Sequence, residues 1–212
     1  MDAADYWILD SAHEAWYPLD LLVSPDIEAA YNRATHGLSY EALLAVLERL
    51  FQRGDLAAEL VERPEVRRPT QPTRAEIEAA LARTIFMIYG LSLQGGARWE
   101  AVSQPDWRRY IYGAYTIDPH EGEIIAQDRA VVETYLACLP YVTDTIVEPT
   151  SLTWDVLEPW HATYWKTLPI GHRVRFRYTS LDSNEPRIVP PDMAQWLERM
   201  QQWYTPYDPQ RS

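Results

Sequence analysis

Apolar positions in the first half of the chain change from a helical to a strand period near residue 54. Five apolar residues share one helical stripe: Leu43, Leu44, Leu47, Leu50 and Phe51. Their spacing places all five on one side of an α-helix. Gly54 follows where a left-handed residue commonly ends a helix. Residues Leu56–Glu62 then alternate apolar and polar side chains, which predicts a short strand.

The segments on either side of this helix and strand carry weaker signals. Residues Ser11–Leu22 have a helical pattern of apolar positions. A second weak helix is expected after Ser24, a capping residue, with Pro25 in its first turn. Residues Arg63–Pro72 are rich in proline and arginine, so we expect a loop there.

A helix, a buried strand and another helix are predicted after this loop. Thr73 and Glu76 have the spacing of a capping box, which predicts a helix over Arg74–Arg83. The stretch Thr84–Ser92 is apolar nearly throughout and predicts a central strand. Residues Leu93–Val102 are expected to form the helix that follows.

The second half of the chain has a different character. Residues Asp128–Leu139 predict a helix, and Pro190–Tyr204 predict a C-terminal helix. Four short runs between them have strand-like composition and are separated by proline and glycine: "YVTDTIVE", "SLTWDVLE", "HATYWKTL" and "HRVRFRYT". Short runs of this kind predict an antiparallel sheet. The fold class expected is α+β, with an N-terminal unit over 1–115 and a second unit over 116–212.

The N-terminal order of elements resembles winged-helix regulators of the MarR and PadR types. The residues that carry the resemblance are "SYEALLAVLERLFQRGDLAAELV" and "IYGLSLQGGARWE", within residues 11–102. It implies that the helix before the first wing strand enters the major groove of DNA. It also implies that arginines of the wing loop reach a minor groove. These arginines are Arg63, Arg67, Arg68 and Arg74. A full helix between the two wing strands departs from the family pattern.

Charge opposes the DNA-binding function that this resemblance implies. The chain has a net charge of −12, and the excess of acids is shared by both halves. Glu41 and Glu48 are expected on the outward side of the helix that would face phosphates. An acidic protein is repelled by nucleic acid and attracted to basic partners. Arginine is used almost to the exclusion of lysine, which is typical of a protein from a GC-rich bacterium.

Several catalytic and cofactor motifs are incomplete. Gly90 and Gly95 have the spacing of a phosphate-binding loop, but Gly96 and Ala97 stand where lysine and a hydroxyl residue are required. "HEAWY" has Tyr17 where a zinc protease has its second histidine. Cys138 lies in a helical pattern and is expected to be a buried apolar residue. We therefore expect no cofactor and no metal ion.

The glycines of "YGLSLQGGARWE" then need another explanation. Gly90 is expected to end a strand, and Ser92 is placed to cap the following helix. Gly95 and Gly96 near the start of a helix each cost roughly 1 kcal/mol relative to alanine. We expect close approach of a neighbouring element to require them.

One strand of the second half carries the best candidate surface. Arg173, Arg175 and Arg177 alternate with apolar residues, so all three guanidinium groups lie on one face. They either pair with acids on neighbouring strands or form a stripe that binds an anion or a partner. Trp160, Tyr164 and Trp165 lie close by in sequence, and aromatic residues with arginine are typical of interaction hot spots.

The function expected is that of a non-catalytic, acidic protein-binding module, such as an immunity-type or antitoxin-type inhibitor or an adaptor. Its partner is expected to be a protein, with a basic one favoured. Two alternatives stay open: a winged-helix transcriptional regulator, and an enzyme whose site includes His161 and His172 with Glu158 nearby. The sequence also predicts a cytoplasmic protein, because it has no long apolar run and its N-terminus is acidic.

Overall fold

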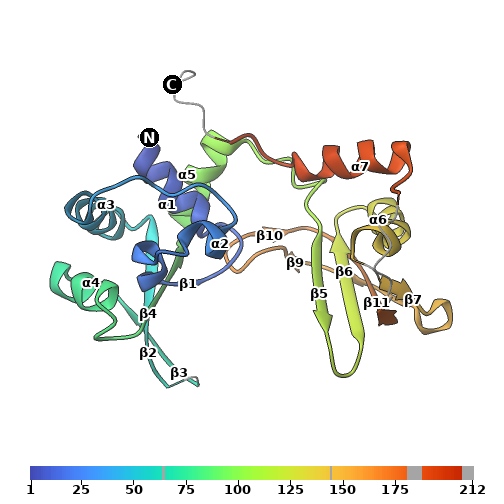
Figure 1. The fold of residues 1–212 in the computed structure, drawn as a ribbon, viewed down its shortest axis with the longest axis horizontal. Helices are drawn as coiled ribbons and strands as arrows, with labels where there is room; N and C mark the ends of the chain where they lie inside the picture. Colours follow the sequence, from blue (N-terminus) through green and yellow to red (C-terminus); the bar gives the residue numbers. More distant parts are fainter. Residues whose placement is uncertain (64, 144, 181–187, 207–212) are drawn as a thin grey trace. The chain divides into compact units, whose positions relative to one another are not determined.

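The computed structural model describes residues 1–63, 65–143, 145–180 and 188–206 (Figure 1). The chain is 40% helical and 27% strand, and its strands pair antiparallel, so the predicted α+β class is confirmed. It divides into two compact units. Unit 1 holds Met1–Ser103, Thr163–Lys166 and Pro206. Unit 2 holds Gln104–Ala162 and Thr167–Thr205.

Unit 1 combines helices with a four-stranded antiparallel sheet in the order β1-β4-β2-β3. Its helices are α1 (Ala3–Ser11), α2 (Ile27–Tyr31), α3 (Tyr40–Gln52), α4 (Arg74–Leu81) and α5 (Leu93–Ser103), with the 3-10 helix η1 (Leu19–Val23). Its strands are β1 (Tyr17–Pro18), β2 (Leu56–Arg63), β3 (Val66–Thr70) and β4 (Met87–Leu91).

Helix α3 is the element that the sequence predicted best. All five residues of its apolar stripe are fully buried. The side chain of Ser39 caps the helix by accepting a hydrogen bond from the amide of Ala42 at 3.3 Å. Gly54 follows with φ of +71°, as predicted for a helix-ending glycine. Strand β2 then begins at Leu56 and pairs with the buried strand β4.

Helix α4 begins with the predicted capping box. The Thr73 hydroxyl accepts a hydrogen bond from the Glu76 amide at 3.3 Å. The Glu76 carboxylate accepts one from the Thr73 amide at 2.8 Å. These bonds to the charged carboxylate hold the pKa of Glu76 below its ordinary value. The box therefore contributes stability at neutral pH that is lost as the pH falls through this lowered pKa.

Thr73→Ala is expected to lower the free energy of unfolding by about 1 kcal/mol, because it leaves an amide of the first turn unpaired. Urea denaturation of the full chain measures the change. Thr84→Ala is the matched control, since Thr84 is exposed and lies after α4. Equal stability of the two variants would show that the capping box contributes nothing.

The predicted helix over Ser11–Leu22 is wrong. Helix α1 ends where that helix was expected to begin, and Tyr17 and Pro18 form the short strand β1 against β4. The residue before a proline is sterically excluded from helical backbone angles, which favours an extended Tyr17. The weak apolar pattern after Pro18 corresponds to the 3-10 helix η1.

The loop predicted over Arg63–Pro72 contains the strand β3, so that prediction is also wrong in part. Strand β3 pairs with β2 at the edge of the sheet, as Figure 1 shows. Most of its side chains are exposed, so it has no buried face to produce an alternating pattern. Pro69 is tolerated there because an edge strand leaves one side of its backbone unpaired.

Aromatic and polar side chains share the centre of unit 1. Asp10 is buried and accepts a hydrogen bond from the Trp99 indole at 2.7 Å. The hydroxyl of Tyr89 lies 2.8 Å from that of Ser11 and 3.1 Å from that of Tyr31. Burial raises the pKa of Tyr89 to about 12. These side chains place polar groups in the core without leaving them unpaired.

Gly95 and Gly96 of "YGLSLQGGARWE" lie against neighbouring groups, as predicted, and so does Gly90. A Cβ atom on Gly95 would lie 1.9 Å from the carbonyl oxygen of Asp55. One on Gly96 would lie 2.1 Å from the Trp165 ring, and one on Gly90 would lie 2.8 Å from the Tyr164 hydroxyl. Distances below 3.0 Å are not possible for a real side chain without movement. Close packing therefore explains all three glycines.

Unit 2 is built on a five-stranded antiparallel sheet. Its strands are β5 (Tyr112–Thr116), β6 (Glu121–Ala126), β7 (Thr145–Val147), β8 (Thr153–Leu157) and β11 (Gly171–Ser180). The order is β5-β6-β11, with β8 and β7 both paired to β11. The other elements are α6 (Arg129–Val142), α7 (Pro191–Gln201), the 3-10 helix η2 (Pro149–Ser151), and the short pair β9 (Trp160–His161) and β10 (Thr167–Leu168).

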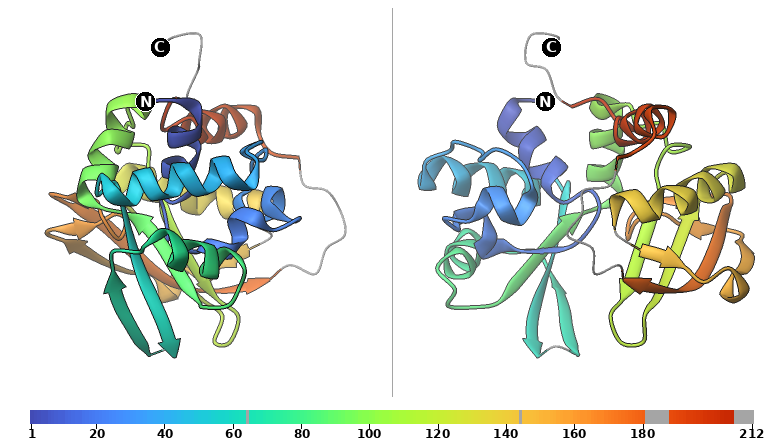
Figure 2. Two further views of the ribbon diagram at one scale, coloured as in Figure 1. Left: turned by 90° about the vertical axis from the view of Figure 1, so that its left-hand side faces the viewer. Right: turned by 45° about the vertical axis from the view of Figure 1, so that its right-hand side comes forward.

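Helix α6 covers one face of this sheet (Figure 2). The core between them consists of Ile124, Ala126, Val132, Leu139, Val174 and Phe176. Cys138 is buried in α6, as predicted, and burial raises the pKa of its thiol. Among the described residues, no helix is long and apolar enough to cross a lipid bilayer.

Candidate functional site

Strand β11 places the three predicted arginines on the face of the sheet opposite α6. Val174 and Phe176 point into the core, so the alternating residues Arg173, Arg175 and Arg177 take the other face. The prediction that the three arginines share one face of a strand is confirmed. The antiparallel register then decides which side chains lie beside the arginines.

Three rows of side chains cross this face at right angles to the strands. The first row is Tyr112, Ile125, Arg173 and Asp155; the second is Ala114, Glu123, Arg175 and Thr153; the third is Thr116, Glu121 and Arg177. In the second and third rows an arginine on β11 therefore stands opposite a glutamate on β6. We call the six charged residues of the three rows the charged face: Glu121, Glu123, Asp155, Arg173, Arg175 and Arg177.

Arg173 is the most firmly held of the three arginines. Its guanidinium group donates two hydrogen bonds to the Asp155 carboxylate, at 2.8 and 2.7 Å. Glu123 lies 3.7 Å away on the other side. Hydrogen bonds from Arg173 hold the pKa of Asp155 below its ordinary value, so this pair remains ionised at neutral pH. Pairing with acids on neighbouring strands, one of the two expected arrangements, is thus observed for Arg173.

Arg175 and Arg177 are more open to solvent. Their side chains are 54% and 62% exposed. Arg175 contacts Asp155 through one nitrogen at 3.2 Å, and Arg177 contacts Glu148 at 3.1 Å. Neither forms an ion pair with the glutamate opposite it in the register. Surface pairs of this kind contribute little stability and are readily exchanged for contacts with a partner.

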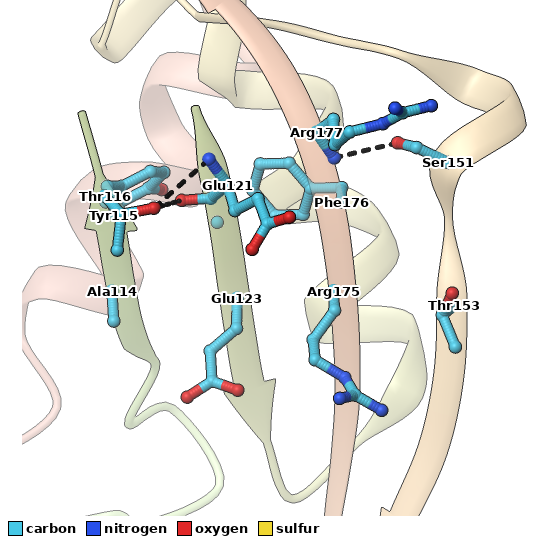
Figure 3. A pocket seen from close by; sticks show the side chains of 11 residues that line it. Ala114, Tyr115, Thr116, Glu121, Glu123, Ser151, Thr153, Arg175, Phe176 and Arg177 are labelled. Carbon is cyan, nitrogen blue, oxygen red and sulfur yellow. Dashed lines mark hydrogen bonds between the residues drawn. The ribbon is translucent and has the colours of Figure 1, made fainter. Parts of the chain in front are cut away.

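A hollow of about 640 Å³ lies over the second and third rows. Figure 3 shows Glu123 and Arg175 on adjacent strands, with the small residues Ala114 and Thr153 on the strands to either side. The hollow is present because these flanking side chains are short. Glu121 also lines the hollow, is exposed, and has no ion-pair partner among the described residues. The site therefore offers guanidinium donors and carboxylate acceptors side by side.

The aromatic residues predicted to accompany the arginines are not on this surface. Trp160 is 2% exposed and packs against Gly171 and Tyr110 inside unit 2. Trp165 is 8% exposed and donates its indole hydrogen to the carbonyl of His13 at 2.7 Å in unit 1. These two tryptophans are core residues, so their predicted role in binding a partner is corrected.

Tyr164 has a similar structural role in unit 1. Its hydroxyl donates to the carbonyl of Ala12 at 2.7 Å and accepts a hydrogen bond from the amide of Leu91. Tyr164 and Trp165 belong to the segment Thr163–Lys166 that the chain contributes to unit 1 between β9 and β10. The expected strand "HATYWKTL" is interrupted there.

The arginines predicted for the wing are divided between two environments. Arg63, Arg67 and Arg68 are exposed on the β2–β3 hairpin. Arg67 and Arg68 approach Glu59 and Glu62 only at 4.0 and 3.8 Å. Arg74 lies apart from them, at the start of α4, and pairs with three carboxylates: Glu41, Glu48 and Glu78. Arg74 is therefore neutralised within the fold.

The two histidines of the enzymatic alternative occupy different places in unit 2. His161 lies on β9, where its Nδ1 is 2.9 Å from the Thr167 hydroxyl. His172 lies on β11 and lines a second cavity. Within the described ranges, no group of three or more His, Cys, Asp or Glu side chains is arranged to hold a metal ion.

Comparisons of the chain with protein-family models, with curated proteins and with solved structures gave no match. We therefore infer function from the side chains and their geometry. The sequence indicated the arginines of β11 but not the glutamates of β6. A signal was present, because Glu121 and Glu123 alternate with Gly122 and Ile124.

Proposed function

We propose that the protein is a non-catalytic binding protein that recognises another protein through the charged face of unit 2. The observation that carries the proposal is the second row of side chains. Glu123 and Arg175 stand opposite each other without pairing, and short residues on both sides leave them accessible in a hollow. An immunity-type or antitoxin-type inhibitor, or an adaptor, acts by binding of this kind.

The partner favoured by the charges is a basic protein that also carries acidic side chains. A net charge of −12 attracts a basic partner over a distance and raises the rate of association. At short range, Arg175 and Arg177 require carboxylates, while Glu121 and Glu123 require cations. Alternate residues on a strand are about 7 Å apart, so each pair of like charges suits a partner with the same spacing.

Affinity capture from an extract of the producing organism tests this proposal. Arg175→Glu/Arg177→Glu is expected to weaken capture of the partner at least tenfold, because both cations are replaced by repelling acids. Arg67→Glu/Arg68→Glu is the matched control, since it makes the same change of charge on the exposed hairpin of unit 1. Equal loss in the two double variants would leave only a general effect of net charge and would refute the proposal.

A second candidate function is DNA binding by unit 1 as a winged-helix regulator. It is favoured by the pairing of β2 with β4, the two strands on which the resemblance rests, and by the exposed arginines of the β2–β3 hairpin. Two observations oppose it. Arg74 pairs with Glu41 and Glu48, which lie on α3. Arg49 on α3 and Arg53, the residue that follows this helix, both pair with Asp5.

Fluorescence anisotropy with labelled duplex DNA distinguishes the two functions. For a winged-helix regulator, Arg67→Glu/Arg68→Glu is expected to lower DNA affinity by at least tenfold, with steep dependence on salt. Arg175→Glu/Arg177→Glu is then expected to have a smaller effect. Binding that is unchanged by the hairpin variant would remove the hairpin from any role in DNA recognition.

A further inference from the structure

A second cavity in unit 2 lies on the α6 side of the sheet and has a volume of about 580 Å³. We call it the α6 pocket. Its lining residues are Arg108, Gln127, Asp128, Arg129, Val131, Ile170 and His172. The volume is within the range of about 300 to 1,000 Å³ that is usual for small-molecule sites.

Two nitrogen-bearing side chains of the α6 pocket are available for a ligand. The guanidinium group of Arg108 and the ring of His172 have no hydrogen-bond or ion-pair partner among the described residues. Arg129 is held in place, because it donates to Glu133 at 2.8 Å and lies over the Trp154 ring at 4.4 Å. The pocket thus gathers two arginines and a histidine in a protein of strongly negative charge.

The acid in the lining is already engaged. Asp128 caps α6 by accepting a hydrogen bond from the Ala130 amide at 2.9 Å. Because this carboxylate already occupies the first turn of α6, an anion in the pocket would be held by Arg108 and His172 rather than by the helix end. Val131 and Ile170 supply an apolar wall beside them.

We propose that the α6 pocket binds a small organic anion, with its oxyanion group at Arg108 and His172 and its apolar part against Val131 and Ile170. Arginine binds carboxylate and phosphate groups through two parallel hydrogen bonds, and either group satisfies this geometry. The apolar wall distinguishes the ligand from a free inorganic ion, because it adds contact area only for a ligand with a hydrocarbon portion.

This site is separate from the charged face. His172 belongs to the set of β11 residues that includes Val174 and Phe176, on the α6 side of the sheet. Arg173, Arg175 and Arg177 lie on the other side. Binding at the α6 pocket therefore goes beyond the proposed function, and its failure would not affect recognition of a protein partner.

Isothermal titration calorimetry of the full chain tests the proposal with four probes. Hexanoate and phenyl phosphate represent the two chemistries with an apolar part, and acetate and inorganic phosphate are their truncated counterparts. We expect hexanoate or phenyl phosphate to bind at least fivefold more tightly than its truncated counterpart. The probe that binds identifies a carboxylate or a phosphate ligand.

Arg108→Gln and His172→Gln are each expected to weaken binding of that probe by roughly tenfold, the factor for loss of one charge-assisted hydrogen bond. Arg199→Gln is the matched control, since Arg199 is an exposed arginine on α7. Thermal unfolding confirms that each variant is folded. Arg108 is exposed, so the Arg108→Gln variant still tests the proposal if His172→Gln is unstable. No binding of any probe at 10 mM, or equal binding by Arg108→Gln and Arg199→Gln, would overturn the proposal.

Discussion

Gly95→Ala is expected to lower the free energy of unfolding by about 3 kcal/mol or more. The added Cβ would lie 1.9 Å from the carbonyl oxygen of Asp55, which is a backbone atom and cannot rotate away. That carbonyl also accepts a hydrogen bond from the Ser92 amide at 3.0 Å. The Asp55 side chain is fully buried and pairs with Arg53 at 2.8 Å and Arg98 at 3.3 Å. Relief of the clash would therefore disturb several interactions.

Helix propensity alone would predict the opposite change in the free energy of unfolding. Gly95 lies in α5, where alanine by itself would stabilise the helix by about 1 kcal/mol. Urea denaturation followed by circular dichroism measures the difference. Gly113→Ala is the matched control, because a Cβ there would meet its nearest neighbour at an ordinary 3.5 Å. A Gly95→Ala protein as stable as the wild type would contradict the packing seen in unit 1.

Trp165→Ala is expected to cost about 3 to 5 kcal/mol of stability, since it empties a buried site the size of an indole. The same substitution removes the hydrogen bond from the indole to the His13 carbonyl. Trp165 also lies against Gly96, where an added Cβ would be 2.1 Å from the ring. Gly96→Ala in the wild-type background is therefore expected to destabilise the protein as well.

A double-mutant cycle tests this contact directly. In the absence of the indole, Gly96→Ala no longer meets the ring, so the double variant is expected to lose at least 1 kcal/mol less than the two single losses combined. Trp165→Leu replaces Trp165→Ala in the cycle if the alanine variant fails to fold. Losses that add within about 0.5 kcal/mol would show that Gly96 is not required by the packing of Trp165.

The sequence correctly predicted the helices whose apolar stripe and capping residues lie within or next to the helix itself. Helix α3 has a complete apolar stripe with a capping serine and a closing glycine, and α4 has a capping box. Strand β3 and the β5–β6 hairpin were not predicted. Strands β3 and β5 expose most of their side chains, so neither has a buried face to produce an alternating pattern.

The candidate site was predicted in part for the same reason. The alternation around Arg175 is a property of one strand and can be recognised in sequence. Its position opposite Glu123 depends on the register of β11 with β6, which joins segments about fifty residues apart. The positions of Trp160 and Trp165 also depend on distant contacts. An aromatic residue that is near arginines in sequence can lie either on the surface or in the core.

We propose that the charged face is the surface that contacts a protein partner. A photo-crosslinking amino acid at Thr153, in the row of Arg175, tests it in the producing cell most directly. The same amino acid at Ala82, an exposed position of unit 1, is the control. We predict one discrete protein adduct from position 153, which is absent from position 82 and lost in Arg175→Glu/Arg177→Glu. Adducts of equal yield from both positions, or an adduct at 153 that persists in the charge-reversed variant, would show that the charged face does not bind the partner.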